Sequence, residues 1–342
     1  MIMIPHNAVL ELTYRCNHTC KFCSCPWYAP NSHYPKGKEL NIAQWIHVID
    51  RLYDMGVQYF SISGGECLLK DCLPEILTYI HENSQKKNLP QRIVLISNGL
   101  NMSEDFLRLF KETGVQLSMS LPGIKTFEYH TGVNNARNVL YWFKRAKEYG
   151  LHTTLNVTVT QMNYDELFET IATGILSGAS SVLLNRFLPG GRGLSHMNEL
   201  LLSPKQLNGM LDTAEEVLGY CNRQGHVGTE FPLCVIEHPE KYRHIKVGTC
   251  CAAAKGFFVI GPSGEIRVCN HSPRIIGNIL DEDPIHDIEY WNTFAESNYH
   301  PEPCKYCKML PICDCGCREV ANILTGSPCG TESSLEGAIK PS

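Results

Sequence analysis

The sequence lacks long hydrophobic runs and lacks any excess of positive charge. No apolar stretch approaches the length of about 18 residues that a membrane-spanning helix needs. The net charge of −5 gives no electrostatic reason to expect a nucleic-acid partner. The first residues, MIMIPHNAVLEL, do not have the basic and apolar regions of a signal peptide. We therefore expect a soluble, cytoplasmic protein that acts without membrane or nucleic acid.

Cysteine, by contrast, is abundant: the chain has 17. Structural disulfides are rare in a reducing compartment, and disulfide frameworks are typical of short secreted chains. Clustered reduced thiolates instead bind soft metals, so the choice lies between zinc and iron–sulfur. Isolated residues such as Cys67, Cys72 and Cys221 are interpreted as buried free thiols. The groups within 16–25 and 304–317 are too dense for that interpretation.

Strand and helix patterns alternate along the first 190 residues. The predicted strands are Val9–Thr13, Tyr59–Ile62, 93–96, 115–119, 154–159 and 181–184, with helices near 41–55, around Leu73–Ile80, and near 103–112, 134–149 and 164–177. Gly56, Gly114 and Gly150 stand where three of the helices should end. Because parallel neighbours need helical crossovers, the pattern predicts an α/β fold with a parallel sheet. It leaves both a doubly wound sheet and a partial barrel open.

In either architecture the loops after the carboxyl ends of the strands carry the chemistry. Three such loops are polar here: the cysteine loop, Ser63–Glu66 and Ser97–Gly99. A helix at about 204–224 is interpreted as a connector. Beyond it the chain is rich in cysteine, glycine and proline, and the segment 257–269 has the pattern of a β-hairpin.

The first cysteine group reads CNHTCKFC from Cys16 to Cys23. Three thiolates do not complete a tetrahedral zinc site, but they can hold three irons of a four-iron cluster and leave the fourth open for a ligand. This C-x3-C-x2-C spacing, with Phe22 before the last cysteine, resembles the signature of the radical S-adenosylmethionine (SAM) superfamily. The sequence Ser63-Gly64-Gly65-Glu66 after the second strand matches the GGE motif of the same family.

The resemblance implies a partial (β/α)6 TIM-like barrel that binds SAM at the open iron. Reductive cleavage of SAM would give a 5′-deoxyadenosyl radical, which abstracts a hydrogen atom from substrate. Gly64 and Gly65 would let the backbone approach the methionine moiety, and Glu66 would accept from its ammonium group. The SAM-binding residues that the resemblance implies are Phe22, Ser63, Gly64, Gly65, Glu66, Asn98, Ser118, Ser120 and Arg186.

The C-terminal cysteines resemble the SPASM extension of this superfamily, which holds two auxiliary four-iron clusters. By that resemblance the distal cluster would bind Cys304, Cys307, Cys313 and Cys329, and the proximal one Cys250, Cys269 and Cys317. The fourth iron of the proximal cluster would bind Cys251 or Cys234, or would be left open for substrate. Cys315 is an extra thiol between two ligands. Asn270 stands where sulfatase-maturating relatives have an Asp, which argues against that activity, and His271 is interpreted as structural.

The predicted organisation is a radical SAM core over 1–200, a connecting helix over 201–229, a SPASM domain over 230–335 and a tail over 336–342. The expected enzyme is an oxidoreductase that modifies a ribosomally made peptide by crosslinking, epimerisation or oxidation. It would use a flavodoxin- or ferredoxin-type electron donor. The chain starts almost at the first strand, which leaves little room for a peptide-recognition domain. A small-molecule reaction on a tetrapyrrole side chain, sugar or alcohol is the alternative, and a non-catalytic electron carrier is a remote one.

Cys25 falls outside the three-cysteine pattern. It is interpreted either as a packed thiol or as a residue that faces the substrate.

The cysteine count leads to a first prediction. Protein reconstituted anaerobically should bind about twelve irons per chain, because three four-iron clusters are expected. Iron and sulfide analysis with absorption spectroscopy would measure this. A colourless protein loaded with zinc would contradict it.

Overall fold

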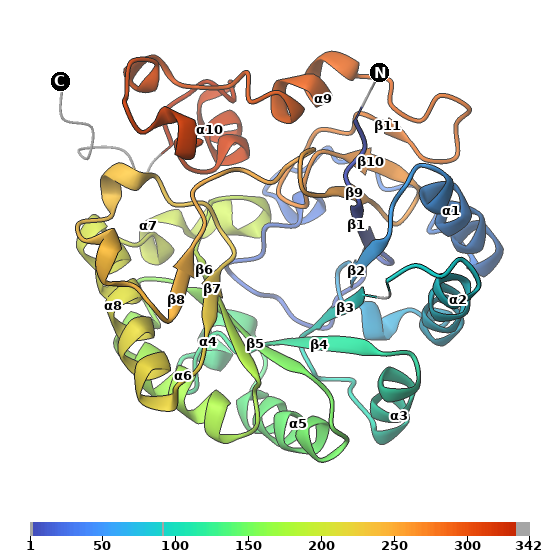
Figure 1. Ribbon diagram of the computed structural model, residues 1–342, viewed down its shortest axis with the longest axis horizontal. Coiled ribbons are helices and arrows are strands. Elements are labelled where there is room, and N and C mark those ends of the chain that lie inside the picture. The colour runs from blue at the N-terminus through green and yellow to red at the C-terminus, as the bar shows by residue number, and fades with distance from the viewer. Residues whose placement is uncertain (1–2, 91, 333–342) are drawn as a thin grey trace.

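The computed structural model describes residues 3–90 and 92–332, and in this part of the chain one curved sheet of 11 strands is surrounded by helices (Figure 1). The strand order is β11-β10-β9-β1-β2-β3-β4-β5-β6-β7-β8. The predicted tail, 336–342, lies outside the described residues. Within the described ranges, every helix is too short or too polar to cross a lipid bilayer.

The first six strands form the predicted parallel sheet, in sequence order. They are β1 (Asn7–Glu11), β2 (Tyr59–Ser63), β3 (Arg92–Ser97), β4 (Val115–Ser120), β5 (Thr153–Val159) and β6 (Ser181–Arg186). Leu10 of β1 lies opposite Ile62 of β2, which lies opposite Leu95 of β3. These three side chains are fully buried, so the apolar pattern fixes the register. The sheet curls into a partial barrel, which confirms that fold class.

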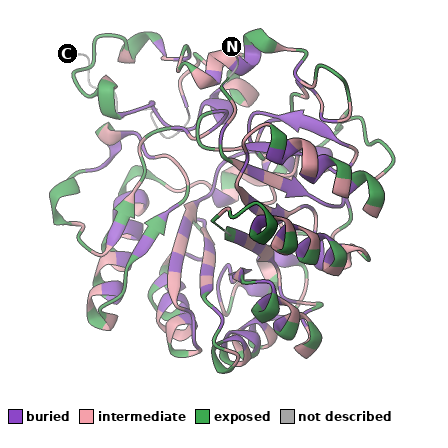
Figure 2. Cartoon of the chain, turned by 45° about the vertical axis from the view of Figure 1, so that its right-hand side comes forward, coloured by how far each residue is buried: buried purple, intermediate pink, exposed green. Residues whose placement is uncertain are grey.

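The helices cover the outside of the sheet and bury only one face each (Figure 2). They are α1 (Ile42–Asp54), α2 (Leu73–Lys86), α3 (Glu104–Glu112), α4 (Phe127–Thr131), α5 (Ala136–Glu148), α6 (Leu167–Leu176), α7 (Met197–Leu200), α8 (Pro204–Cys221), α9 (Ile288–Ala295) and α10 (Arg318–Thr325). In α1, Asn41 and Gln44 form a capping box, and Trp45 is fully buried. Gly56 and Gly150 follow helix ends with positive φ, as predicted.

The first strand is shifted from its predicted position. Residues 9–13 were expected to form it, but β1 is Asn7–Glu11. Leu12 still donates to the Ser63 carbonyl at 3.0 Å, and Gly65 donates to the Thr13 carbonyl at 2.7 Å. The strand therefore ends at Glu11, because residues 12 and 13 hydrogen-bond with the end of β2 and the turn that follows it.

The sheet extends beyond the six predicted units at both ends. The added strands are β7 (Gly225–Val227) and β8 (Ile245–Val247) next to β6, and β9 (Phe258–Ile260), β10 (Glu265–Arg267) and β11 (Gly277–Asn278) next to β1. β9 and β10 are the arms of the predicted hairpin and pair antiparallel. β9 pairs parallel with β1, so the cysteine-rich half is joined to the barrel through the sheet itself.

A buried ion pair crosses this junction. The Arg267 guanidinium at the end of β10 donates to the Glu11 carboxylate at the end of β1, and both side chains are buried. Arg267 also donates to the Ser272 carbonyl at 3.0 Å, and the rings of Trp27 and Tyr34 each lie 5.8 Å from the guanidinium. A charge at this depth is tolerated only with such partners.

This ion pair leads to a stability prediction. Arg267→Met should lower the free energy of unfolding by about 3–5 kcal/mol, because the buried Glu11 carboxylate loses its partner. Urea denaturation of the anaerobic protein would measure the difference. The control is the double variant Glu11→Gln with Arg267→Met, which should recover part of the loss. A single variant as stable as the parent would show that water reaches the carboxylate.

Candidate active site

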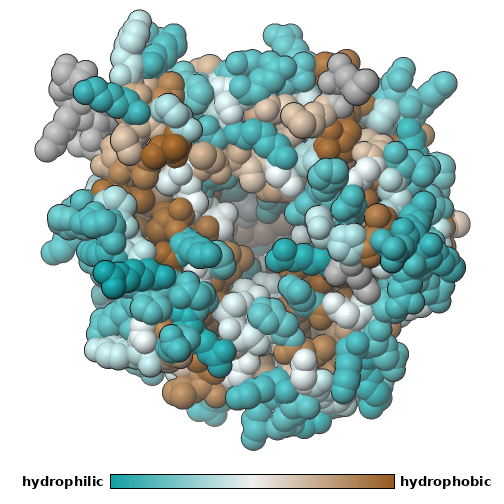
Figure 3. All heavy atoms as spheres, in the orientation of Figure 1, coloured by the Kyte–Doolittle hydropathy of each residue, from teal (hydrophilic) through white to brown (hydrophobic). Residues whose placement is uncertain are grey.

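A cavity of about 460 Å³ lies where the carboxyl ends of β1 to β6 meet. In the orientation of Figure 1, the surface is hollowed near its centre (Figure 3). The barrel side of the wall comprises Glu11, Cys16, His18, Cys20, Phe22, Cys23, Ser24, Cys25, Ser63, Gly64, Gly65, Glu66, Ser97, Asn98, Ser120, Asn156, Thr158, Asn185 and Arg186. The predicted convergence of three polar loops on one rim is therefore observed, and the later strands join them.

The loop after β1 presents Cys16, Cys20 and Cys23 to this cavity. Burial raises the pKa of the Cys20 thiol, and the neighbouring charges of Cys23 and Cys16 raise it further. The three sulfurs thus lie within electrostatic range of one another. As thiolates they would repel each other at this depth, so the donor set fits a cationic iron–sulfur core that compensates their charge.

Cys25 is placed next to this group. The proximity of its thiol lowers the pKa of Cys23 to about 7. The Cys25 sulfur also lies 3.9 Å from the Gly64 carbonyl. Of the two interpretations of Cys25, the packed thiol has a specific partner in the structure. Cys25 also lines the cavity, so a substrate contact stays a prediction.

The Gly-Gly-Glu turn lies directly against the cysteine loop. A Cβ on Gly65 would stand 2.0 Å from the Arg15 carbonyl oxygen, and one on Gly64 2.9 Å from that of Thr13. The Glu66 amide donates to the Arg15 carbonyl at 2.8 Å. The two glycines therefore let the turn after β2 approach the loop after β1, whatever their part in binding a cofactor.

Glu66 links the turn to the next loop. Its carboxylate accepts from the Ser97 hydroxyl and the Asn98 amide, both at 2.8 Å, and from the Leu68 amide at 3.1 Å. Burial raises the pKa of this carboxyl. These contacts hold the ends of β2 and β3 together, while the predicted contact with a SAM ammonium group stays a prediction.

The other predicted cofactor residues divide into two groups. Phe22, Ser63, Asn98 and Ser120 line the cavity, whereas Ser118 is buried beside it and, among the described residues, its hydroxyl has no hydrogen-bond partner. Arg186 lines the wall, but its guanidinium donates to both oxygens of Glu332, at 2.7 and 2.8 Å. Arg186 therefore ties the end of β6 to the C-terminal segment.

The cysteine-rich half closes the other side of the same cavity. Cys251, Cys269 and Cys317 line the wall, together with Asn270 and His271. Cys250, predicted as the ligand, is exposed, and the buried residue is its neighbour Cys251. His271 lies 2.7 Å from the Pro189 carbonyl, in keeping with the structural role expected for it.

A second cysteine group lies in the cysteine-rich half, outside the cavity wall. Burial raises the pKa of Cys234 to about 11, and the charges of Cys313, Cys304 and Cys307 contribute. Cys234 therefore lies with three of the predicted distal ligands. Cys329, the fourth predicted distal ligand, is exposed, and its sulfur is 3.9 Å from the Asn298 carbonyl.

The cysteine side chains that line the cavity are spread around its wall and do not converge on a single position. In the described ranges, no three His, Cys, Asp or Glu side chains converge as ligands of a single metal ion. A four-iron cluster has a different requirement, because each cysteine binds a different iron.

Sequence reasoning missed several wall residues. Asn156 and Thr158 alternate along β5, and Asn185 lies on β6. A period-two polar pattern facing the barrel interior was the available signal. Glu230 and Glu319 also line the wall. No local sequence pattern distinguishes these two carboxylates from surface residues.

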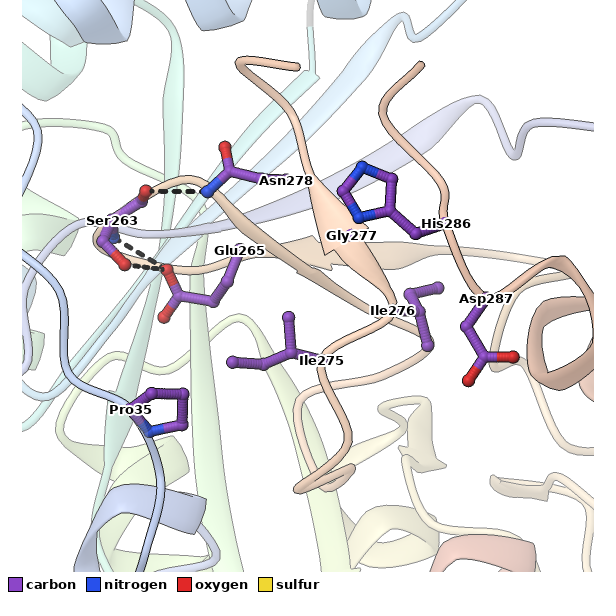
Figure 4. Close-up of a pocket in the computed structure, with 9 residues that line it drawn as sticks. All are labelled: Pro35, Ser263, Glu265, Ile275, Ile276, Gly277, Asn278, His286 and Asp287. Atoms are coloured by element: carbon purple, nitrogen blue, oxygen red, sulfur yellow. Dashed lines mark hydrogen bonds between the residues drawn. The ribbon is translucent and has the colours of Figure 1, made fainter. Parts of the chain in front are cut away.

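A second cavity, of about 540 Å³, lies beside β10 and β11 (Figure 4). The Glu265 carboxylate on its wall accepts from Ser263 and also from the hydroxyls of Tyr14 and Tyr34, at 2.8 and 3.0 Å. These contacts already use both oxygens of the carboxylate. Its evident role is to join the cysteine loop to the hairpin.

Comparisons with known proteins agree with this geometry. Residues 10–173 match the family model described as the radical SAM superfamily. A PqqA peptide cyclase of Granulibacter bethesdensis is 26% identical over 337 residues, which cover 94% of this chain and 84% of that protein. The structure of Streptococcus suis SuiB bound to precursor peptide SuiA has a TM-score of 0.73 at 16% identity, and covers 97% of this chain and 76% of its own. The structure of anSMEcpe with bound AdoMet has a TM-score of 0.73 at 18% identity, with 96% and 94% covered. The two structures show a shared fold.

The steric contact of Gly65 can be tested directly. Gly65→Ala should displace the cysteine loop, so amide hydrogen exchange within residues 16–25 should become at least about tenfold faster. Exchange followed by mass spectrometry measures this. Gly248→Ala is the matched control, because its Cβ would meet only the Val227 carbonyl at 3.7 Å. Unchanged exchange in Gly65→Ala would show that the loop tolerates the added carbon.

Proposed function

We propose that the chain, whose residues 10–173 match the radical SAM superfamily model, is a radical SAM enzyme that modifies a ribosomally made peptide. The observation that carries the proposal is the similarity to PqqA peptide cyclase, which extends over 94% of the chain and therefore through the cysteine-rich half. The fold shared with SuiB, whose structure holds a precursor peptide, supports the same substrate class.

Within the cavity, Cys16, Cys20 and Cys23 would hold a four-iron cluster with SAM at its open iron. When bound and reduced by one electron, this pair supplies a carbon-centred radical that removes a hydrogen atom from the substrate. The polypeptide positions the partners. Gly65 and Glu66 hold the cysteine loop in place, and the wall of β3 to β6 offers amide and hydroxyl groups to an adenosyl moiety. Both halves of the chain line the cavity that would hold the reacting atoms.

For the cysteine-rich half we propose a SPASM domain with two auxiliary clusters. Cys269 and Cys317 are retained as proximal ligands, and the cavity position of Cys251 favours it over Cys250 as their partner. Cys234 is better placed for the distal cluster, because Cys304, Cys307 and Cys313 lie around it. The division into a core over 1–200, a connecting helix and a SPASM domain over 230–335 is part of this proposal.

The electrons would come from a flavodoxin- or ferredoxin-type donor. The alternative reactions on a tetrapyrrole, sugar or alcohol require the same cluster and SAM. A non-catalytic electron carrier would not need a SAM site. Substrate assays therefore distinguish peptide modification from the small-molecule reactions. Cleavage of SAM distinguishes both kinds of enzyme from the electron carrier.

Replacing Cys16, Cys20 and Cys23 by Ala should abolish reductive cleavage of SAM and leave about eight irons on the chain. Chromatography of 5′-deoxyadenosine and iron analysis measure the two effects. Cys72→Ala is the matched control, because this half-buried cysteine belongs to neither thiol group. Cleavage that persists in the triple variant would show that the cluster assignment is wrong.

The substrate class needs a separate assay. The reduced holoenzyme should convert a short peptide encoded beside its gene to a product of altered mass or, on epimerisation, altered retention, and form 5′-deoxyadenosine with it. Mass spectrometry with chromatography measures both. Cleavage of SAM with unchanged peptide, together with conversion of a tetrapyrrole or sugar, would move the proposal to the small-molecule alternative.

A further inference from the structure

The segment after β6 is packed against the backbone of the cysteine loop. Gly191 has a φ of +49°, and a Cβ there would lie 2.6 Å from the Cys23 carbonyl and 2.5 Å from that of Cys25. The Gly193 amide donates to the Cys23 carbonyl at 3.2 Å. Two glycines thus bring this segment into backbone contact with the loop that carries the three thiols.

Arg192 lies between these glycines, so its guanidinium is brought to the same loop. It donates to the Cys20 carbonyl at 3.0 Å and lies 4.7 Å from the centre of the Tyr28 ring. Among the described residues, Arg192 forms no ion pair with a carboxylate. Its positive charge is therefore not neutralised by an acidic neighbour.

The guanidinium of Arg192 thus lies at the backbone of Cys20, one of the three predicted ligands. The segment that carries it also contacts the Cys23 carbonyl through Gly193. A cation held against this loop favours added negative charge on a group that the loop binds.

We propose that Arg192 raises the reduction potential of the cluster held by Cys16, Cys20 and Cys23, and so makes its one-electron reduction easier. This rests on the proposed function. On reduction the cluster would take one electron from a flavodoxin- or ferredoxin-type donor without a proton, and its net charge would become more negative by one. No bond forms or breaks in this step. A fixed positive charge at the loop stabilises the reduced state more than the oxidised one.

The experiment is a redox titration of the anaerobic holoenzyme, with dithionite as the reductant and electron paramagnetic resonance as the readout. The signal that changes when SAM is added identifies the cluster in question. Arg192→Gln should shift its reduction equilibrium against the reduced form by on the order of tenfold, which is about 59 mV for one electron. Arg192→Lys keeps the charge and should retain most of the potential. Signals that do not respond to SAM should keep their midpoints.

Three results would overturn the proposal. An unchanged potential with weaker SAM binding in Arg192→Gln would make the residue a ligand of SAM. A loss of about four irons in both variants would make it a packing residue of the loop. An equal fall in potential in Arg192→Lys and Arg192→Gln would show that geometry, and not charge, matters. If the parent protein has no SAM-responsive cluster, the proposed function itself fails.

Discussion

The junction between β1 and the β9–β10 hairpin is the constraint on which the site depends. β9 pairs with β1 through the backbone, and the buried Glu11–Arg267 ion pair lies at the end of that junction. Glu11 is the last residue of β1, so the cysteine loop begins almost at the ion pair. A displacement of the hairpin would therefore move the first thiols and the opposite wall of the cavity together.

The junction is reinforced by aromatic and hydroxyl groups of the cysteine loop. Tyr14 and Tyr34 both donate to Glu265 of β10, and Trp27 packs edge-on against Tyr14. The loop is thereby fastened to the cysteine-rich half on one side and to the turn after β2 on the other. Three thiols that repel one another as thiolates need such support, because the loop has no regular secondary structure around them.

The sequence was informative where side-chain periodicity extends over several residues. The six strands, their helices and the glycine helix ends follow from local patterns, and the strand ends then place three loops on one rim. The three-residue strands β7 and β8 were too short to show a period, and the predicted hairpin of β9 and β10 gave no sign of its partner in the sheet. Their place depends on partners far away in the chain, as in the contact of Ala8 with Phe258. No local rule supplies that pairing.

The same limit explains why the structure brings some of the predicted site residues together in the cavity and gives others a different partner. Cys16, Cys20 and Cys23 occupy one loop, so spacing alone brings them together. Arg186 was singled out for its position after β6, but its partner Glu332 lies 146 residues away. Cys250 and Cys251 are adjacent in sequence, and only burial distinguishes them.

Two of the cysteines outside the predicted ligand pattern take part in one repeated arrangement. Cys25 follows Cys23 by two residues, and Cys315 follows Cys313 by two. In each pair the proximity of the second thiol lowers the pKa of the first, to about 7 and about 6. Hydrogen bonds to cluster-bound sulfur are one of the means by which proteins adjust a cluster. In both pairs a cysteine outside the predicted ligand pattern is thus the neighbour of a predicted ligand.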